Sequence, residues 1–218
     1  MDKIAVVIPA FNESHSISSV VTDVYVYGQP IVVDDGSQDN TAYLAESAGA
    51  IVVRHKVNMG YDSALESGLF KAIALGFEYA VTFDADGQHI PHLLLAFKEQ
   101  LTLGADLVVG TRDFYQRSSE ILFSIVSRLF WGIPDPLCGM KGYKLSHLSS
   151  LGYFDSYKSI GTEFALRCAR AGLCIRTVPV HTQRRLDVSR FGSGLCPNLR
   201  ILRSLTLGFF RAHSINRS

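Results

Sequence analysis

The sequence predicts an α/β protein with a single doubly wound, mostly parallel sheet flanked by helices. Two observations support this prediction. Short apolar segments rich in β-branched residues recur through the first half of the chain, as in strands buried on both faces. Helix-like segments of ten or more residues separate them, a spacing typical of parallel strands joined by crossover helices. At 218 residues, the chain has the length of one domain with a sizeable core.

The expected elements follow one another in a regular order at first and less regularly later. The predicted strands of the first half are Ile4–Ile8, Ile31–Val33, Ile51–Arg54, Tyr79–Phe83 and Leu107–Val109. The helices expected between them cover about residues 14–27, 39–48, 60–76 and 91–103. In the second half we expect helices at 121–133, within 161–172 and from Asn198 to about His213, with a strand at 174–180.

The net charge of +1 conceals a strong asymmetry along the chain. Residues 1–109 contain 5 Lys and Arg against 14 Asp and Glu, whereas residues 110–218 contain 16 against 6. An acidic half suits a cation site, and a basic half suits an anionic partner such as phosphate or a lipid surface. The arginines are dispersed and no nucleic-acid-binding module is recognisable, so we expect no nucleic-acid partner.

Cysteine spacing and hydropathy bear on the cellular compartment. The four cysteines show neither CxxC pairing nor the spacing of a zinc site, which indicates reduced thiols in a cytoplasmic protein. No segment approaches the roughly 18 uncharged apolar residues that a spanning helix needs. The apolar run at the N-terminus is short and leads directly into a turn, so we expect no secretory signal peptide.

The fourth predicted strand ends in two carboxylates, Asp84 and Asp86. At a strand end, Asp-x-Asp can turn both side chains toward one point. Two carboxylates that close are costly without a cation between them, and a hard ion such as Mg²⁺ or Mn²⁺ takes oxygen ligands. An acidic turn in water is the alternative for an isolated pair. His89 and His92 lie nearby, but such an ion prefers oxygen, so we expect structural roles for them.

Polar motifs follow four of the predicted strands. They are PAFNES (9–14), DDGSQDNT (34–41), DADGQH (84–89) and GTRD (110–113). Because ligands of doubly wound proteins bind at the carboxyl ends of the strands, we expect the four motifs to form one site. The sequence contains neither GxGxxG nor GxxxxGK[ST], which excludes a dinucleotide fingerprint and a P-loop.

The chain resembles the family 2 glycosyltransferases, and most closely the dolichyl- and polyprenyl-phosphate sugar transferases, over residues 3–190. The motifs that carry the resemblance occur in the family's order: VVIPAFNES, VVDDGSQDNT, FDADGQH, GTR and GTEFALRCARAG. The resemblance implies a GT-A fold with a Rossmann-like sheet and an inverting sugar transfer. It also implies a nucleoside-diphosphate-sugar donor and a divalent metal, Mg²⁺ or Mn²⁺.

The resemblance also assigns roles to individual residues. Phe11 would pack on the base or ribose, and Asp35 would hydrogen-bond one of them. The metal ligands would be Asp84, Asp86 and Gln88. The residues with donor-binding roles, two of them arginines discussed below, are Pro9, Ala10, Phe11, Glu13, Val33, Asp35, Gly60, Asp84, Ala85, Arg184 and Arg190. For Gly60, a capping role at the start of a helix is the alternative.

Basic residues would hold phosphate groups. Arg112 in GTR would contact a phosphate or the acceptor, and Arg184 and Arg190 would clamp the donor diphosphate or a lipid phosphate. Two departures from the family pattern occur here, since Arg190 replaces a lysine and the spacing before Arg184 is one residue short. Arg185 is therefore an alternative to Arg184.

A third departure lies in DPLCGMK (135–141), where Cys138 and Met140 replace a serine and a phenylalanine of the family pattern. Because this segment faces the acceptor in relatives, we expect the protein to differ from them in its acceptor.

The nature of the acceptor decides whether a catalytic base is needed. A hydroxyl acceptor requires a carboxylate base, for which Asp135 and Glu163 are the candidates. Glu163 alternatively stabilises a helix start through the helix dipole. A phosphate acceptor is already anionic at neutral pH and needs positioning instead. We expect a polyprenyl-phosphate acceptor; the alternatives are a saccharide hydroxyl in cell-surface polysaccharide synthesis and a non-catalytic nucleotide-sugar-binding subunit.

Residues 198–218 are expected to form an amphipathic C-terminal helix beyond a catalytic domain of residues 1–197. Ile201, Leu205 and Phe209 fall on one face and Arg200 and Arg203 on the other. A basic amphipathic helix can lie in a membrane interface, and packing on its own domain is the alternative. The first reading predicts a peripheral protein on the cytoplasmic face of a membrane.

Overall fold

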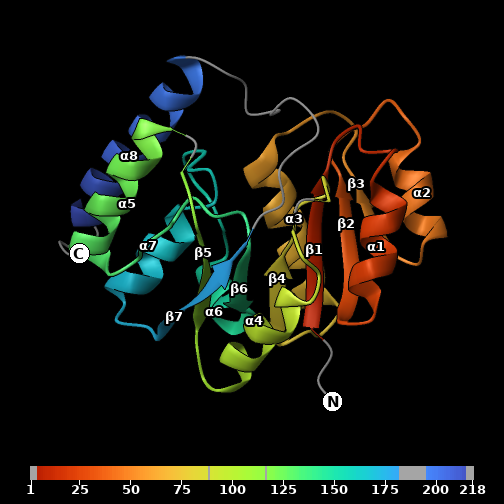
Figure 1. The fold of residues 1–218 in the computed structure, drawn as a ribbon, viewed down its shortest axis with the longest axis horizontal. Helices are drawn as coiled ribbons and strands as arrows, with labels where there is room; N and C mark the ends of the chain where they lie inside the picture. The colour runs from red at the N-terminus through yellow and green to blue at the C-terminus, as the bar shows by residue number, and fades with distance from the viewer. Residues whose placement is uncertain (1–3, 88, 116, 182–194, 215–218) are drawn as a thin grey trace.

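Seven strands form one sheet in the order β3-β2-β1-β4-β6-β5-β7, with helices on both faces (Figure 1). The structure is a computed structural model that describes residues 4–87, 89–115, 117–181 and 195–214. The strands are β1 Ile4–Ala10, β2 Gly28–Asp34, β3 Ile51–Arg54, β4 Tyr79–Thr82, β5 Leu107–Arg112, β6 Lys141–Lys144 and β7 Ile175–Val180. The predicted α/β class with a mostly parallel sheet is confirmed.

The strand β6 breaks the parallel pattern because it lies antiparallel between β4 and β5. The sequence analysis did not predict it. Its four residues, KGYK, begin and end with lysine and contain a glycine, so they lack the apolar, β-branched character of a buried strand. Lys141 and Gly142 are nevertheless buried, since β6 lies inside the sheet.

The helices cover the sheet in two layers. They are α1 Ile17–Tyr25, α2 Thr41–Ser47, α3 Tyr61–Ala74, α4 Leu93–Thr102, α5 Ser118–Trp131, α6 Leu145–Leu151, α7 Glu163–Arg170 and α8 Leu195–Ser214. Alternate residues of β1 face the two layers. Val6 and Ile8 belong to the core that includes α1 and α4, whereas Ala5 and Val7 belong to the core with α3 and α7. This alternation gives β1 the continuous apolar sequence that predicted it.

Helix α3 approaches the sheet unusually closely at Gly68. A Cβ atom built there would lie 2.4 Å from Val7 Cγ1 and 3.0 Å from Val33 Cγ2. Only glycine fits at this distance without displacing the strands. The close packing brings the first turn of α3 to the carboxyl edge of the sheet.

Helix α8 lies beside α5 at the end of the molecule beyond β7 (Figure 1). Its Ile201 and Leu205 are buried against Phe123 of α5. Gly208 faces α7, because a Cβ there would lie 2.7 Å from a methyl carbon of Leu166. The apolar face that the sequence offered to a membrane is therefore largely committed to the protein itself. Within the described ranges, no helix has the length and apolarity to cross a membrane.

Candidate active site

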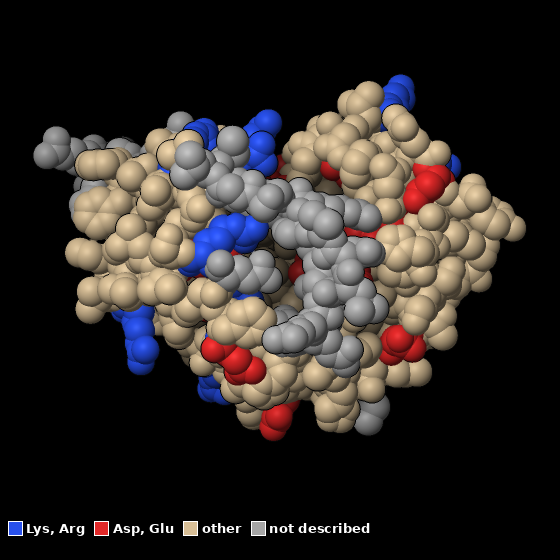
Figure 2. Space-filling view, turned by 45° about the horizontal axis from the view of Figure 1, so that its top comes forward, with Lys and Arg blue, Asp and Glu red and all other residues tan. Residues whose placement is uncertain are grey.

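A cavity of about 560 Å³ opens at the carboxyl edge of the sheet. All four polar motifs contribute to its wall. The predicted site residues that line it are Pro9, Ala10, Phe11, Glu13, Asp35, Gly60, Asp84, Ala85, Asp86 and Arg112. Figure 2 shows acidic side chains in the hollow and basic side chains gathered on its α5–α8 side. The topology of the sheet thus brings together residues that are more than a hundred positions apart in the sequence.

The first two motifs hold each other in place. The backbone N–H of Asn12, which has a φ of +54°, donates to Ser37 Oγ at 2.9 Å, and the N–H of Gln38 donates to Asn12 Oδ1 at 2.9 Å. The N–H of Glu13 donates to Thr41 Oγ1 at 2.8 Å. These reciprocal bonds fix the turn after β1, so that Phe11 and Glu13 line the cavity.

Asp35 organises the third loop. Its carboxylate accepts hydrogen bonds from the backbone N–H groups of Met59 and Gly60, at 2.9 and 2.8 Å, and contacts His55 Nδ1 at 2.6 Å. The sequence analysis did not identify His55, which also contacts Ser67 Oγ of α3 through Nε2 at 2.9 Å. In the structure, Asp35 joins the end of β2 to the start of α3, and it still lines the cavity where a base or ribose could reach it.

The Asp84 carboxylate lies at the cavity wall with its side chain one-third exposed, at 33%. His89 Nε2 contacts Asp84 Oδ2 at 2.9 Å, and the His89 ring packs edge-on against Phe83. On another side, a Cβ at Gly139 would lie only 2.7 Å from Asp84 Oδ2. His89 and the bare backbone of Gly139 therefore fix the orientation of the carboxylate. His92 instead packs edge-on against Tyr27, outside the residues that line the cavity.

Asp84 and Asp86 fit a hard divalent ion. Both carboxylates line the same cavity, and Mg²⁺ or Mn²⁺ is commonly held by one or two carboxylates while water and substrate phosphates complete its shell. In the described part of the chain, no three His, Cys, Asp or Glu side chains cluster closely enough to hold an ion without such partners. The third predicted ligand, Gln88, lies outside the described residues.

Arg112, which also lines the cavity, forms a largely buried ion pair with Asp135. Arg112 donates from Nε to Asp135 Oδ2 at 2.8 Å and from Nη2 to Oδ1 at 2.9 Å, and its backbone N–H donates to Oδ2 at 3.1 Å. Glu120 Oε2 lies 3.3 Å from Arg112 Nη1. Burial lowers the pKa of Arg112, but the hydrogen bonds and charge of Asp135 raise it by more, so the guanidinium stays charged.

The burial and hydrogen bonds of Asp135 do not suit the role of a catalytic base. The side chain is 1% exposed, both oxygens accept from Arg112, and Asp135 is not among the residues that line the cavity. A carboxylate so engaged holds Arg112 at the cavity wall and does not present a free oxygen to an acceptor.

Glu163, the other candidate base, also lies away from the cavity lining. Its oxygens accept from the backbone N–H of Ser156 at 2.6 Å and from Ser156 Oγ at 2.9 Å. Burial raises the pKa of Glu163. The contact ties the start of α7 to the preceding loop, which is a structural role. Val33 likewise is fully buried, under Gly68 of α3, and does not line the cavity.

Residues 5–150 match the family described as glycosyl transferase family 2, which is more than half of the chain. The chain belongs to glycosyltransferase family 2. It is 32% identical to polyprenol monophosphomannose synthase of Mycolicibacterium smegmatis, over 85% of this chain and 79% of that protein. It is 35% identical to UDP-N-acetylglucosamine–dolichyl-phosphate N-acetylglucosaminyltransferase of Methanococcus voltae, over about half of each chain (50% and 51%).

Among solved structures, glucosyl-3-phosphoglycerate synthase of Mycobacterium tuberculosis has the same fold. The TM-score is 0.75 at 22% identity, and the match covers 95% of this chain and 79% of that one. That crystal contains Mn²⁺, UDP-glucose and phosphoglyceric acid. The predicted GT-A fold is confirmed.

The segment 135–141 of this glycosyltransferase contributes to the cavity through residues other than those that depart from the family pattern. Cys138 and Met140 are fully buried, whereas Leu137 and Gly139 line the cavity. Burial raises the pKa of the Cys138 thiol to about 11, so it stays protonated and unreactive at neutral pH. Lys141 Nζ donates to the Cys138 carbonyl at 2.7 Å, which satisfies a buried cation behind this wall.

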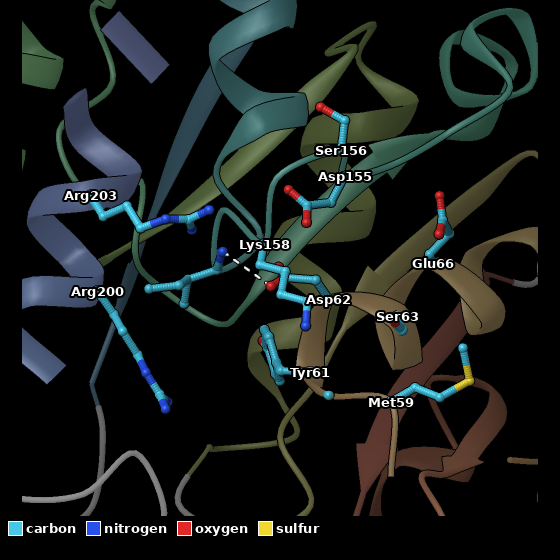
Figure 3. A pocket seen from close by; sticks show the side chains of 12 residues that line it. Met59, Tyr61, Asp62, Ser63, Glu66, Asp155, Ser156, Lys158, Arg200 and Arg203 are labelled. Atoms are coloured by element: carbon cyan, nitrogen blue, oxygen red, sulfur yellow. Dashed lines mark hydrogen bonds between the residues drawn. The ribbon is translucent and has the colours of Figure 1, made fainter. Parts of the chain in front are cut away.

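A second cavity of about 520 Å³ adjoins the first and shares Gly60, Tyr61, Ile160 and Arg200 with it (Figure 3). Its acidic side chains hold the loop before α7. Asp62 accepts from the backbone N–H groups of Ile160, at 3.3 Å, and Gly161. Ile160 has a φ of +61°, a strained value for a β-branched residue that these bonds help to maintain.

Glu66 and Arg203 hold the same loop from other sides. Glu66 Oε1 accepts from the N–H of Phe154 at 2.8 Å, and Arg203 Nη1 donates to the Tyr157 carbonyl at 3.0 Å. The side chains that line the second cavity thus mainly hold the loop that places Ile160 at the wall of the first cavity. Arg184 and Arg190 lie outside the described residues, so their predicted roles stay predictions.

Proposed function

We propose that this glycosyltransferase transfers a sugar, with inversion, from a UDP- or GDP-sugar to a polyprenyl phosphate. The observation that carries the proposal is that acidic and basic side chains line one cavity. Asp84 and Asp86 line it, and we call them the acidic wall; Arg112 and Arg200 line it together with Phe114 and Leu137, and we call these the basic wall, since basic side chains gather on the α5–α8 side of the hollow (Figure 2). The names of the mycobacterial and archaeal relatives, which refer to polyprenol and dolichyl phosphate, support the same acceptor class.

The acidic wall suits the donor. Phe11, Asp35, Asp84 and Asp86 line the same cavity, so Phe11 and Asp35 would hold the base and ribose and the two later aspartates would face the diphosphate. Mg²⁺ or Mn²⁺ held by the two carboxylates, with Gln88 as a third candidate, would supply positive charge to the departing diphosphate. The presence of Mn²⁺ and UDP-glucose in the mycobacterial structure supports a metal and a nucleotide sugar as ligands of this chain.

The basic wall suits a phosphate acceptor. A phosphate monoester is already an anion near pH 7, since its second pKa is about 6, so it needs no base. Arg112 is held charged and in place by Asp135 and can grip such a phosphate. The positions of Asp135 and Glu163, both engaged elsewhere, agree with a reaction that does not use a carboxylate base. An acceptor that enters opposite the diphosphate would invert the anomeric carbon.

Binding and transfer assays with Asp86→Ala test the proposal. UDP or GDP with Mn²⁺ should raise the melting temperature of the wild type, because a ligand that binds only the native state stabilises it. Asp86→Ala should abolish the Mn²⁺-dependent part of the shift and lower sugar transfer to a short-chain polyprenyl phosphate by at least roughly 100-fold. Asp23→Ala, an exposed carboxylate of α1, is the matched control and should behave as wild type.

Three outcomes contradict the proposal. Unchanged transfer by Asp86→Ala contradicts the metal role. Transfer to saccharide hydroxyls but not to polyprenyl phosphate replaces the acceptor with the polysaccharide alternative. Donor binding without any turnover shows a non-catalytic nucleotide-sugar-binding subunit.

A further inference from the structure

The outward face of α5 is apolar, the reverse of what a surface helix normally shows. Its buried side contains Ser119, Glu120 and Ser127 as well as Phe123, whereas large apolar side chains point to solvent. The exposed apolar residues, which we call the α5 face, are Ile121, Leu122, Ile125, Leu129 and Phe130. Leu129 is 76% and Phe130 is 62% exposed. A contiguous patch of this kind marks an interaction surface, unlike a single exposed leucine.

Helix α8 extends the α5 face. Phe210 is 71% exposed and Leu199 is 63% exposed. The rings of Phe130 and Phe209 pack edge-on at 5.2 Å, and Phe209 packs against Phe210 at 5.9 Å, so the aromatic groups of the two helices are continuous. The surface therefore lies on two packed helices rather than on a loop.

The α5 face is also continuous with the basic wall of the active site, which is proposed to bind the acceptor. Phe114, in the loop that leads into α5, is 53% exposed and lines the cavity. Leu137 lines the cavity as well and packs against the core that joins Phe123 to Ile201. Arg200 reaches the cavity from α8. The layer that presents the apolar face thus builds the basic wall of the active site.

The charges of the two helices favour an anionic partner. Arg128 of α5 is exposed, and the exposed Arg200 and Arg203 of α8 line the cavities beside it. The only acidic residue in the sequence of the two helices is Glu120, which is buried and paired with Arg112 and Arg117. A second copy docked through a two-fold contact would bring this cationic surface against itself, which costs free energy. An anionic bilayer offers both the apolar interior and the negative headgroups.

We propose that the α5 face, extended by Leu199 and Phe210, docks this glycosyltransferase on an anionic lipid bilayer with its basic wall toward the headgroups. The inference rests on the proposed polyprenyl-phosphate acceptor, because docking there brings the cavity to the level of a lipid phosphate. This contact differs from the one expected from the sequence, which was the apolar face of α8. Ile201 and Leu205 of that face are buried against α5, so the proposed contact lies mainly on α5.

Vesicle binding by the full chain tests the inference. Wild-type protein should co-sediment with vesicles of phosphatidylcholine and phosphatidylglycerol, and less with phosphatidylcholine alone. Leu129→Ser/Phe130→Ser should weaken binding at least roughly tenfold, as should Ile125→Glu, which places a negative charge on the same face. Val26→Ser/Tyr43→Ser removes two equally exposed apolar side chains from the α1–α2 end and should bind as wild type.

Activity with two acceptors separates this inference from the proposed function. The α5-face variants should keep transfer to a short, water-soluble isoprenyl phosphate and lose transfer to a long-chain polyprenyl phosphate in vesicles. If the wild type binds vesicles but transfers to neither phosphate, the proposed function fails and the docking surface stands. Wild-type vesicle binding by both α5-face variants overturns the inference. A wild-type dimer that becomes monomeric in both variants, without vesicle binding, overturns it in favour of a second copy.

Discussion

Replacement of Asp135 distinguishes a residue that holds Arg112 from a residue that deprotonates the acceptor. In Asp135→Ala, Arg112 loses three hydrogen bonds of 2.8, 2.9 and 3.1 Å to one carboxylate. Removing one partner of a buried pair typically costs about 3–5 kcal/mol. Glu120 remains at 3.3 Å and keeps part of the compensation, so we expect a loss near the lower limit, about 3 kcal/mol of unfolding free energy.

Activity should fall because Arg112 is no longer fixed at the cavity wall. A loss of about 100-fold in kcat/KM corresponds to about 2.7 kcal/mol of transition-state stabilisation. The assay is a double-mutant cycle of Asp135→Ala and Arg112→Ala, with urea unfolding and transfer kinetics for each variant. If Asp135 acts through Arg112, the double variant should be no worse than Arg112→Ala alone.

Other results would refute this reasoning. Additive losses in the cycle would show that Asp135 acts independently of Arg112. A loss of kcat in Asp135→Asn far greater than in Arg112→Ala, with donor binding intact, would show a catalytic base and restore the hydroxyl acceptor. Asp113→Ala is the control, because this exposed neighbour pairs only with exposed His181 among the contacts described, and its stability should change by less than about 0.5 kcal/mol.

Two further predictions concern Gly139 and Asp62. Gly139→Ala should displace Asp84, because Asp84 Oδ2 would lie 2.7 Å from the new methyl group. Mn²⁺-dependent UDP binding, measured by calorimetry, should weaken about tenfold or more. Unchanged binding would contradict the close packing of Gly139 against Asp84. Burial raises the pKa of Asp62 to about 6 from 3.8, so the folded state retains a proton that the unfolded state loses between these values. The free energy of unfolding should therefore fall by up to about 3 kcal/mol as pH rises from about 4 to about 6. In urea titrations, Asp62→Asn should show a smaller fall over this range. Parallel curves of unfolding free energy against pH for the wild type and Asp62→Asn would refute the raised pKa of Asp62.

The sequence was sufficient to predict most of the sheet because buried parallel strands have a simple signature. Residues such as Val6 and Val7 face opposite cores, so β1 must be apolar throughout. The strand β6 has no such signature. It lies between β4 and β5 through pairing with both strands, and a pairing partner is not visible in four residues with lysine at both ends.

The positions that line the candidate site could be predicted, but the hydrogen-bond partners of each carboxylate could not. Strand-end motifs meet at one edge by topology, which is why Asp35, Asp86 and Arg112 line one cavity. A sequence does not show which partner a carboxylate meets. Asp135 and Glu163 have carboxylates that could act as catalytic bases. In the structure, Asp135 accepts a hydrogen bond from the Arg112 guanidinium and Glu163 accepts one from a serine of the preceding loop.

The C-terminal half shows the same limit for apolar side chains. A helical wheel identifies an apolar face but not whether that face meets protein or solvent. In α8 the apolar face turns inward to Phe123, and the partner helix α5 then has its own apolar residues left on the outside. A helix that contacted only its own domain would gain nothing from Leu129 and Phe130 in solvent, because exposed apolar area is unfavourable. Because Phe114, in the loop that leads into α5, lines the cavity together with Arg112, the proposed docking would make acceptor recognition begin outside the cavity, at the surface of α5.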